Sequence, residues 1–201
     1  MKRTPAETLA EAVAAARACR LCADILPLGP RPVLHVDAAA RLLIASQAPG
    51  TKVHASGQSF DDASGDRLRD WLGIDRTAFY GNRRLAIMAM GLCYPGRDAK
   101  GGDKPPIRIC APTWHPRIRP LLPNIELTLL VGSYAQRFYL GARAKPSLDA
   151  TVAAWRDYLP EYLPLPHPSW RNTGWLKRNP WFERELLPPL RAAVQRLLFP
   201  R

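Results

Sequence analysis

The segment His167-Pro168-Ser169-Trp170-Arg171-Asn172-Thr173-Gly174-Trp175 carries the densest set of side chains capable of chemistry. It combines a histidine, a hydroxyl, an arginine, an amide and two tryptophans, and its prolines disfavour helix. It follows a short apolar run at 162–165 that we expect to end a buried strand. Polar groups just past the carboxyl end of a strand lie where open α/β sheets usually form their sites. Taken alone, however, the segment is better explained as a solvated loop.

The four cysteines form a second candidate site. Cys19 and Cys22 are separated by two residues, and Cys93 and Cys110 follow far downstream. A two-residue spacing lets both thiolates face one metal centre, and a distant pair can complete a four-thiolate site. Such a site could hold an iron–sulfur cluster or zinc, and four buried free thiols are the alternative without a metal. The spacing does not distinguish the two metal centres.

Composition limits the classes of protein to consider. A length of 201 residues predicts a single domain over residues 1–201. The net charge of +12 and the pI of about 10.1 favour a polyanionic partner, nucleic acid first, although a generally arginine-rich composition is the alternative. No apolar run reaches the roughly 20 residues of a membrane span, and the amino terminus does not resemble a signal peptide. We therefore expect a cytoplasmic, bacterial protein without disulfides, acting as a monomer.

Apolar runs alternate with helical patterns along the chain. We expect strands at 41–47, 85–90, 127–131 and 162–165, and helices at 6–18, 64–72, 114–122, 134–140, 148–158 and 181–198. A long polar loop should connect the first strand to residue 63. This alternation predicts a three-layer α/β fold, with a central four-stranded parallel sheet flanked by helices.

The order of the motifs resembles the uracil-DNA glycosylase superfamily, most closely its iron–sulfur families four and five. The matching features are the CxxC pair, a strand that ends in Gln47-Ala48-Pro49-Gly50, a Ser64-Gly65 helix start, two cysteines about 16 residues apart, and His167-Pro168-Ser169. The resemblance extends from Cys19 to about Asn172. It implies that Cys19, Cys22, Cys93 and Cys110 hold a structural 4Fe-4S cluster, with zinc as the alternative.

The resemblance also implies roles in the active site. Phe60-Asp61-Asp62-Ala63-Ser64-Gly65 resembles a family-five motif and makes Asp62 the catalytic carboxylate, with Asp61 one position away. Asp62 would orient a water and stabilise the sugar cation, while His167 would hydrogen-bond the departing base. A helix-capping role for Asp62 and a core position for Phe60 are the structural alternatives.

The remaining predicted contacts surround an extruded base. Phe60 would stack on the base, and Gln47, Ala48, Gly50, Ala89 and Asn172 would line its pocket. Ser64 and Ser169 would hold phosphates, and Trp170 or Arg171 would wedge into the vacated stack. Arg83, Arg84 and the basic residues from 97 to 119 would add attraction to DNA. His54, His115, Trp175 and Trp181 are expected to be structural.

Two positions depart from the family patterns. Gln47 stands where family four has a water-activating carboxylate, so that role does not transfer. Ala89 stands where pyrimidine-selective members have an asparagine that reads the base, which predicts a broader range of deaminated bases. The expected function is therefore a monofunctional DNA glycosylase for uracil, xanthine and hypoxanthine, since no lysine falls in the matched motifs. One alternative is a catalytically weak protein that binds uracil or abasic DNA. The other is a nucleic-acid-binding module that is stabilised by a metal and has no catalytic activity.

Overall fold

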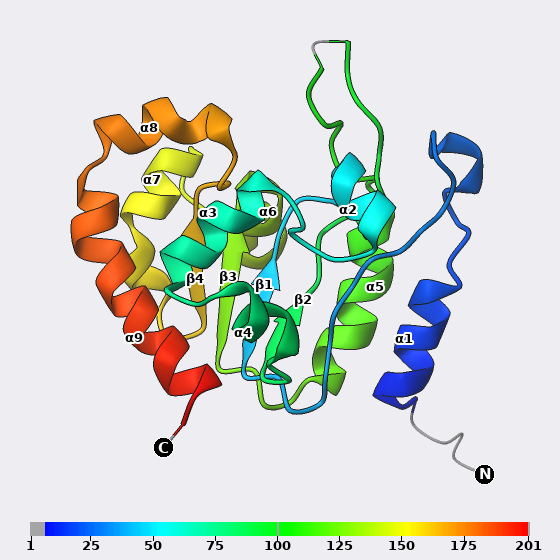
Figure 1. Cartoon of the computed structure of the whole chain (residues 1–201), viewed down its shortest axis with the longest axis horizontal. Coiled ribbons are helices and arrows are strands. Elements are labelled where there is room, and N and C mark those ends of the chain that lie inside the picture. The colour runs from blue at the N-terminus through cyan, green and yellow to red at the C-terminus, as the bar shows by residue number, and fades with distance from the viewer. Residues whose placement is uncertain (1–6, 100, 201) are drawn as a thin grey trace.

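Four short apolar segments form the central sheet of the computed structural model, which describes residues 7–99 and 101–200 (Figure 1). The strands are β1 (Leu42–Ala45), β2 (Leu85–Ile87), β3 (Leu127–Val131) and β4 (Tyr162–Leu165). They are ordered β2-β1-β3-β4, and every neighbouring pair is parallel. The predicted three-layer α/β fold with a four-stranded parallel sheet is confirmed.

Two strands, β1 and β2, are shorter than predicted. β2 ends at Ile87 rather than residue 90, although the chain beyond it still donates backbone hydrogen bonds from Met90 to Ser46 and from Gly91 to Gln47. These bonds continue the β1–β2 contact past the regular ladder. They bring the residues after both strands together at the carboxyl edge of the sheet.

Helices connect and cover the strands. The α-helices are α1 (Leu9–Arg17), α2 (Thr51–Ser56), α3 (Ala63–Leu72), α4 (Arg76–Gly81), α5 (Cys110–Ile118), α6 (Ser133–Leu140), α7 (Leu148–Ala153), α8 (Thr173–Arg178) and α9 (Leu187–Leu198). Short 3-10 turns are η1 (Ala23–Ile25), η2 (Arg119–Leu121), η3 (Gly141–Arg143), η4 (Trp155–Tyr158) and η5 (Trp170–Asn172), and η6 (Phe182–Leu186) is a π-helical turn. Within the described residues, no helix is long and apolar enough to span a bilayer.

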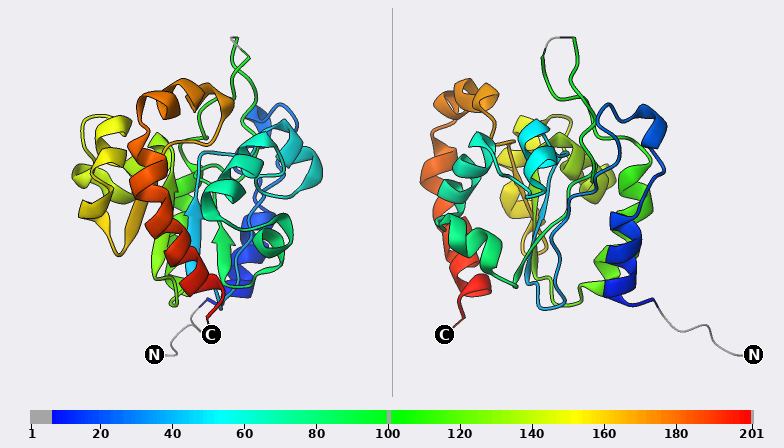
Figure 2. Two further views of the ribbon diagram at one scale, coloured as in Figure 1. Left: turned by 60° about the vertical axis from the view of Figure 1, so that its left-hand side comes forward. Right: turned by 45° about the vertical axis from the view of Figure 1, so that its right-hand side comes forward.

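The two faces of the sheet pack against different helices (Figure 2). Leu42 and Ile44 face a core that includes α3, α4 and α9, while Leu43 on the opposite face packs with α1 and α5. Ala45 continues that second face against α6. Because successive side chains of a strand point to opposite faces, four consecutive apolar residues serve both layers.

Several predicted boundaries were wrong. The helix expected at 114–122 spans Cys110–Ile118. Pro112 lies in its first turn, where backbone N–H groups have no acceptor within the helix, so a proline there removes no hydrogen bond. The polar loop before residue 63 contains α2, and helices α4 and α8 were also missed. Each of these has only six residues, too few to show a helical period.

The other helices differ in their ends. The helix predicted at 148–158 stops at Ala153 and gives way to η4, and the one predicted at 181–198 starts with η6 before α9. Pro188 and Pro189 lie in the first turn of α9 and so begin a helix rather than disturb one. The helix predicted at 6–18 begins after Thr8, whose hydroxyl forms a capping box with Glu11. Its predicted first residue, Ala6, lies outside the described residues.

Candidate active site

A cavity of about 470 Å³ opens at the carboxyl edge of the sheet. It is lined by all the residues assigned above to catalysis, to the base pocket, to the phosphates and to the wedge, namely Gln47, Ala48, Gly50, Phe60, Asp62, Ser64, Ala89, His167, Ser169, Trp170, Arg171 and Asn172. Sequence reasoning missed other lining residues, which include Val33, Ser46, Val53, Ser59, Arg97 and Asp103. The structure therefore gathers segments more than 100 residues apart in the chain around one cavity.

Asp62 caps helix α3 and also faces the cavity. Its Oδ1 accepts a hydrogen bond from the Gly65 backbone N–H at 2.9 Å. Its Oδ2 lies 3.9 Å from the position that a Cβ on Gly50 would occupy. The capping role and a role in the cavity are thus compatible, because each uses a different oxygen. Asp61 does not line the cavity and pairs instead with Arg76 at 2.7 Å, a contact that lowers the pKa of Asp61.

The turn before α3 depends on a close backbone contact. Phe60 has a left-handed backbone, with φ of 59°, and its carbonyl oxygen lies only 1.7 Å from where a Cβ on Gly65 would be. A guanidinium N–H of Arg69 donates to the same carbonyl at 3.2 Å. The Phe60 ring lines the cavity and also packs edge-on against Phe79, with ring centres 6.2 Å apart. Phe60 therefore belongs both to the cavity wall and to the core.

His167 leaves β4 and enters the cavity wall in a defined tautomer. Its Nδ1 accepts a hydrogen bond from the Ser169 backbone N–H at 3.2 Å, so the neutral ring carries its proton on Nε2. Burial lowers the pKa of His167, although the nearby charge of Asp62 raises it. Because the net shift is downward, a neutral imidazole with an Nε2–H donor is the favoured form at neutral pH.

The loop that carries His167 is held from two directions. Asn172 donates its side-chain N–H to the His167 carbonyl at 2.7 Å, so this amide fixes the loop as well as lining the cavity. From α3, Arg67 donates to the Ser169 carbonyl at 2.9 Å and to the Thr173 hydroxyl at 3.3 Å. Sequence reasoning missed Arg67, because nothing in its local sequence indicates a partner about 100 residues away.

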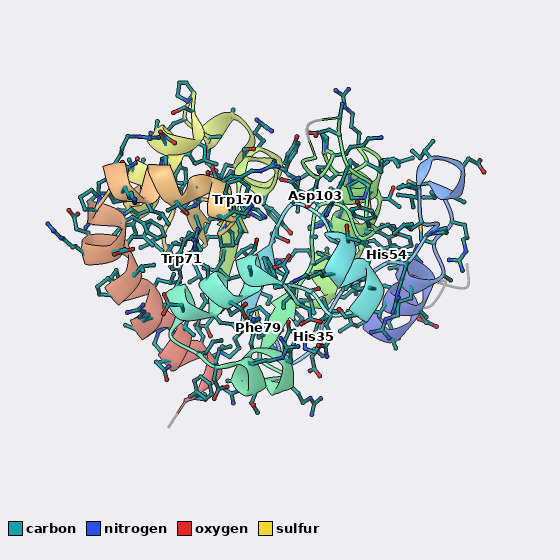
Figure 3. All side chains as sticks on the ribbon, turned by 45° about the horizontal axis from the view of Figure 1, so that its top comes forward. His35, His54, Trp71, Phe79, Asp103 and Trp170 are labelled. Carbon is teal, nitrogen blue, oxygen red and sulfur yellow. The ribbon has the colours of Figure 1, made fainter. Side chains whose placement is uncertain are left out.

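The mouth of the cavity lies between the histidine loop and a hairpin. The hairpin segment, residues 96–99 and 101–104, rises above the sheet and is closed by the Arg97–Asp103 backbone bridge (Figures 1 and 2). Figure 3 shows Trp170 and Asp103 on facing sides of this region. Trp170 is 75% exposed, whereas the Arg171 guanidinium lies against the hairpin, 2.6 Å from where a Cβ on Gly102 would be. Arg171 thus links the two sides of the mouth.

Behind Ala89, a buried histidine supports the cavity wall. His115 is 2% exposed, and its Nε2 lies 3.0 Å from the Ala89 carbonyl oxygen, to which it donates. Its Nδ1 lies 2.7 Å from the Tyr139 hydroxyl, which completes the pairing of the neutral ring. Burial lowers the pKa of His115 to about 4.

We expect His115 to make stability dependent on pH. Its folded-state pKa lies below its unfolded value, so its contribution to stability is complete above pH 6.5 and is lost as pH falls toward 4. The free energy of unfolding that is lost through protonation of His115 is about 3 kcal/mol. Urea unfolding of the wild type and of His115→Gln at pH 7 and pH 4.5 measures it, because the variant should lose less stability on acidification. Equal losses in both proteins would contradict the assignment. The comparison removes the contributions of His35 and His167, whose pKa values burial also lowers.

The four cysteines line one small apolar cavity together with residues such as Leu26, Leu92 and Trp114. All four are free thiols. Burial raises the pKa of Cys22 and Cys93, and that of Cys110 to about 12. The backbone N–H of Leu92 donates to the Cys110 sulfur at 3.2 Å. Among the described residues, no three His, Cys, Asp or Glu side chains are grouped as the ligands of a single metal ion.

The predicted basic contribution to DNA binding needs correction. Arg83 and Arg84 precede β2 and therefore lie at the amino edge of the sheet, opposite the cavity, and Arg83 pairs with Asp37 at 2.8 Å. Arg117 and Arg119 lie at the far end of α5, toward the same edge (Figure 1). Only the earlier part of the basic region, represented by Arg97, lines the cavity. Lys100 of that region lies outside the described part of the chain.

The fold and the cavity define a class of enzyme. The chain belongs to the uracil DNA glycosylase superfamily, whose family model matches residues 34–191. Enzymes of this superfamily are DNA glycosylases, which hydrolyse the bond between a base and its sugar in DNA. The matched range contains the whole cavity except Val33, and it includes Cys93 and Cys110. It begins after Cys19 and Cys22.

Proposed function

We propose that this protein is a monofunctional DNA glycosylase of the iron–sulfur families four and five, which removes uracil and other deaminated bases. The observation that carries the proposal is the pairing of Asp62 and His167 in one cavity. Asp62 keeps Oδ2, and His167 keeps its Nε2–H, without a hydrogen-bond partner among the described residues. One acceptor and one donor are therefore available to opposite ends of a glycosidic bond.

Cleavage of this bond places positive charge on the sugar and negative charge on the leaving base. Asp62 Oδ2 orients a water and stabilises the cation. The His167 Nε2–H donates to a carbonyl oxygen of the base, a hydrogen bond that strengthens as negative charge develops there. The base reaches the cavity by leaving the helix, and the Phe60 ring offers an apolar surface on which it stacks.

DNA is held at the mouth of the cavity. We assign Ser64 and Ser169, which line the cavity, to phosphate contacts. The exposed Trp170 ring is the side chain best suited to fill the stack vacated by the base. Arg171 is committed to the hairpin segment, which makes it the weaker candidate for that wedge. The net charge of +12 adds sequence-independent attraction to the duplex.

The range of bases follows from two side chains. Gln47 and Ala89 line the cavity, and Ala89 offers a methyl group where an amide would read the polar edge of a pyrimidine. A buried amide at position 89 would be left without a hydrogen-bond partner by any base other than a pyrimidine of matching polar edge. Without that amide, the cavity discriminates less between bases. We therefore propose that xanthine and hypoxanthine are substrates besides uracil.

The test uses labelled oligonucleotides that carry one uracil, xanthine or hypoxanthine, followed by alkaline cleavage of abasic sites. We expect cut strands with all three bases, and Ala89→Asn should increase the preference for uracil by about 10-fold or more. A strict preference of the wild type for uracil would contradict the proposed range. Borohydride should trap no covalent protein–DNA adduct, because the proposed mechanism uses no Schiff base.

A second candidate function is a catalytically weak protein that binds uracil or abasic DNA. It is favoured by Gln47, an amide that cannot accept a proton from water. No cut strand, together with retained binding to the same oligonucleotide, would establish this alternative and exclude the glycosylase.

We further propose that Cys19, Cys22, Cys93 and Cys110 bind a structural 4Fe-4S cluster. Four thiols around a cavity, rather than around one point, suit a cluster better than a zinc ion, and the Leu92 N–H contact to Cys110 is of the kind that stabilises cluster sulfur. When bound, the cluster would tie the segment after α1 to the start of α5.

Removal of the cluster should cost stability more than chemistry. Protein purified without oxygen should contain about four irons per chain, and Cys22→Ser should lower both the iron content and the midpoint of thermal unfolding. The rate of base excision per folded molecule should change far less. Stoichiometric zinc in the purified protein, with no iron, would favour the alternative metal.

A further inference from the structure

Asp103 places a second carboxylate over the cavity, from a segment that the glycosylase motifs do not include. Its Oδ2 lies 3.5 Å from the position of a Cβ on Gly50, and Asp62 Oδ2 lies 3.9 Å from the same position. The two oxygens therefore converge on the space above Gly50 from different parts of the chain. Asp62 belongs to the start of α3, and Asp103 to the hairpin segment.

The hairpin that carries Asp103 is held in place by contacts within it and to both sides of the cavity. The Asp98 backbone N–H donates to the Gly102 carbonyl, and the Gly102 N–H donates to the Asp98 side-chain Oδ1. The Lys104 N–H donates to the Gly96 carbonyl. The Gln47 side chain donates to the Lys104 carbonyl at 3.4 Å. Arg171 reaches the hairpin from the histidine loop, as described above.

Few groups in the cavity could accept a proton. Among the described residues that line it, only Asp62, Asp103 and His167 have a side chain of suitable basicity. His167 holds its proton on Nε2 and uses Nδ1 for the Ser169 N–H, so it acts as a donor. Asp62 already shares its charge with the Gly65 N–H through Oδ1. Asp103 is left as the carboxylate least committed to other hydrogen bonds in the cavity.

The electrostatic surroundings of Asp103 also favour a role as a proton acceptor. Partial withdrawal from water and the negative charge of Asp62 raise the pKa of Asp103, and Asp98 adds to this effect. Arg97 on the same hairpin and Arg171 from η5 oppose it, but the net shift is upward. A carboxylate with a raised pKa is a better proton acceptor than an ordinary aspartate.

We propose that Asp103 is a second catalytic carboxylate, which accepts the proton of the attacking water while Asp62 stabilises the sugar cation. This inference rests on the proposed glycosylase function. Water oxygen forms a bond to C1′ of the sugar, and one O–H bond of that water breaks, with its proton passing to Asp103. The bond between C1′ and the base nitrogen breaks, and its electron pair leaves with the base, whose oxygen is hydrogen-bonded by His167. The base leaves as an anion and takes up a proton from solvent, while Asp103 releases to solvent the proton that it accepted. The products are an abasic sugar and the free base, with no change of oxidation state.

The experiment measures single-turnover excision of uracil by the wild type, Asp103→Asn, Asp103→Glu and Asp70→Asn. Asp70 is a matched control, because it is an exposed carboxylate on α3 that lies away from the cavity and has no side-chain partner among the described residues. We expect Asp103→Asn to slow excision by about 100-fold. Asp103→Glu should recover part of this loss, and Asp70→Asn should match the wild type.

Three further measurements separate catalysis from folding and binding. Affinity for an oligonucleotide with an uncleavable 2′-fluoro-2′-deoxyuridine should stay within about threefold of the wild type in Asp103→Asn, because the change removes no phosphate contact. The decline in rate at acid pH should weaken in this variant, since the group whose protonation causes it is gone. A thermal unfolding curve that matches the wild type will establish that the hairpin change is local.

The outcomes distinguish this inference from the function on which it rests. A wild type that excises no base overturns both. An active wild type with an equally active Asp103→Asn overturns only the role of Asp103. A slow variant whose loss is matched by weaker binding, or whose acid limb is unchanged, also overturns it and makes Asp103 a residue that shapes the mouth.

Discussion

Replacing Asp62 with asparagine is expected to slow base excision by about a thousandfold and to leave the protein folded. The reason is that the two carboxylate oxygens have different roles. Oδ1 caps α3 through the Gly65 N–H, and asparagine caps helices as well as aspartate does. Oδ2 faces the cavity, where an amide carries no charge with which to stabilise the sugar cation.

The control for this variant is Asp75→Asn. Asp75 caps α4 in the same way, accepting a hydrogen bond from the Ala78 N–H at 2.7 Å, but it does not line the cavity. Both variants should keep a free energy of unfolding within about 1 kcal/mol of the wild type. Only Asp62→Asn should lose excision while still binding DNA. If both variants remain active, the carboxylate of Asp62 is a helix cap alone.

Substituting Gly65 with alanine is expected to have the largest effect on stability, a loss of about 3 kcal/mol or more. The new Cβ would lie 1.7 Å from the Phe60 carbonyl oxygen and 2.6 Å from its carbon, so the backbone itself must move. That movement displaces the Asp62 cap and the Phe60 ring together. Excision should therefore fall with stability, as measured by urea unfolding and by single-turnover cleavage.

Gly81→Ala provides the matched comparison. Gly81 ends α4, has no unusual backbone angle, and would place its Cβ more than 4 Å from any other group that the structure describes. Alanine at such a helical position should stabilise the protein by about 0.5–1 kcal/mol. A Gly65→Ala variant as stable and active as the wild type would mean that the turn at Phe60 does not need the close contact.

The arrangement of the site depends on contacts that no local pattern reveals. Arg67 holds the histidine loop from α3, Asp103 faces Asp62 from the hairpin, and His115 supports Ala89 from behind. Each contact joins residues from different elements. Their side-chain types are ordinary on the surface or in a core, so only the fold distinguishes them from neighbours of the same type.

The sequence by itself determined the four-stranded sheet and the parallel direction of its strands and, through the family resemblance, many of the residues that line the cavity. Four apolar runs between helical patterns can bury their faces only in a covered parallel sheet, and the polar residues after those runs then meet at one edge. Helices of six residues were not predicted because they are too short to show a helical period. The start of α5 was predicted too late because Pro112, in its first turn, made the segment look non-helical. The tertiary structure alone decided which oxygen of Asp62 is free, which nitrogen of His167 carries the proton, and which arginines lie at the cavity. Those outcomes depend on hydrogen bonds and distances between segments far apart in the chain, which appear only when the sheet brings the segments together.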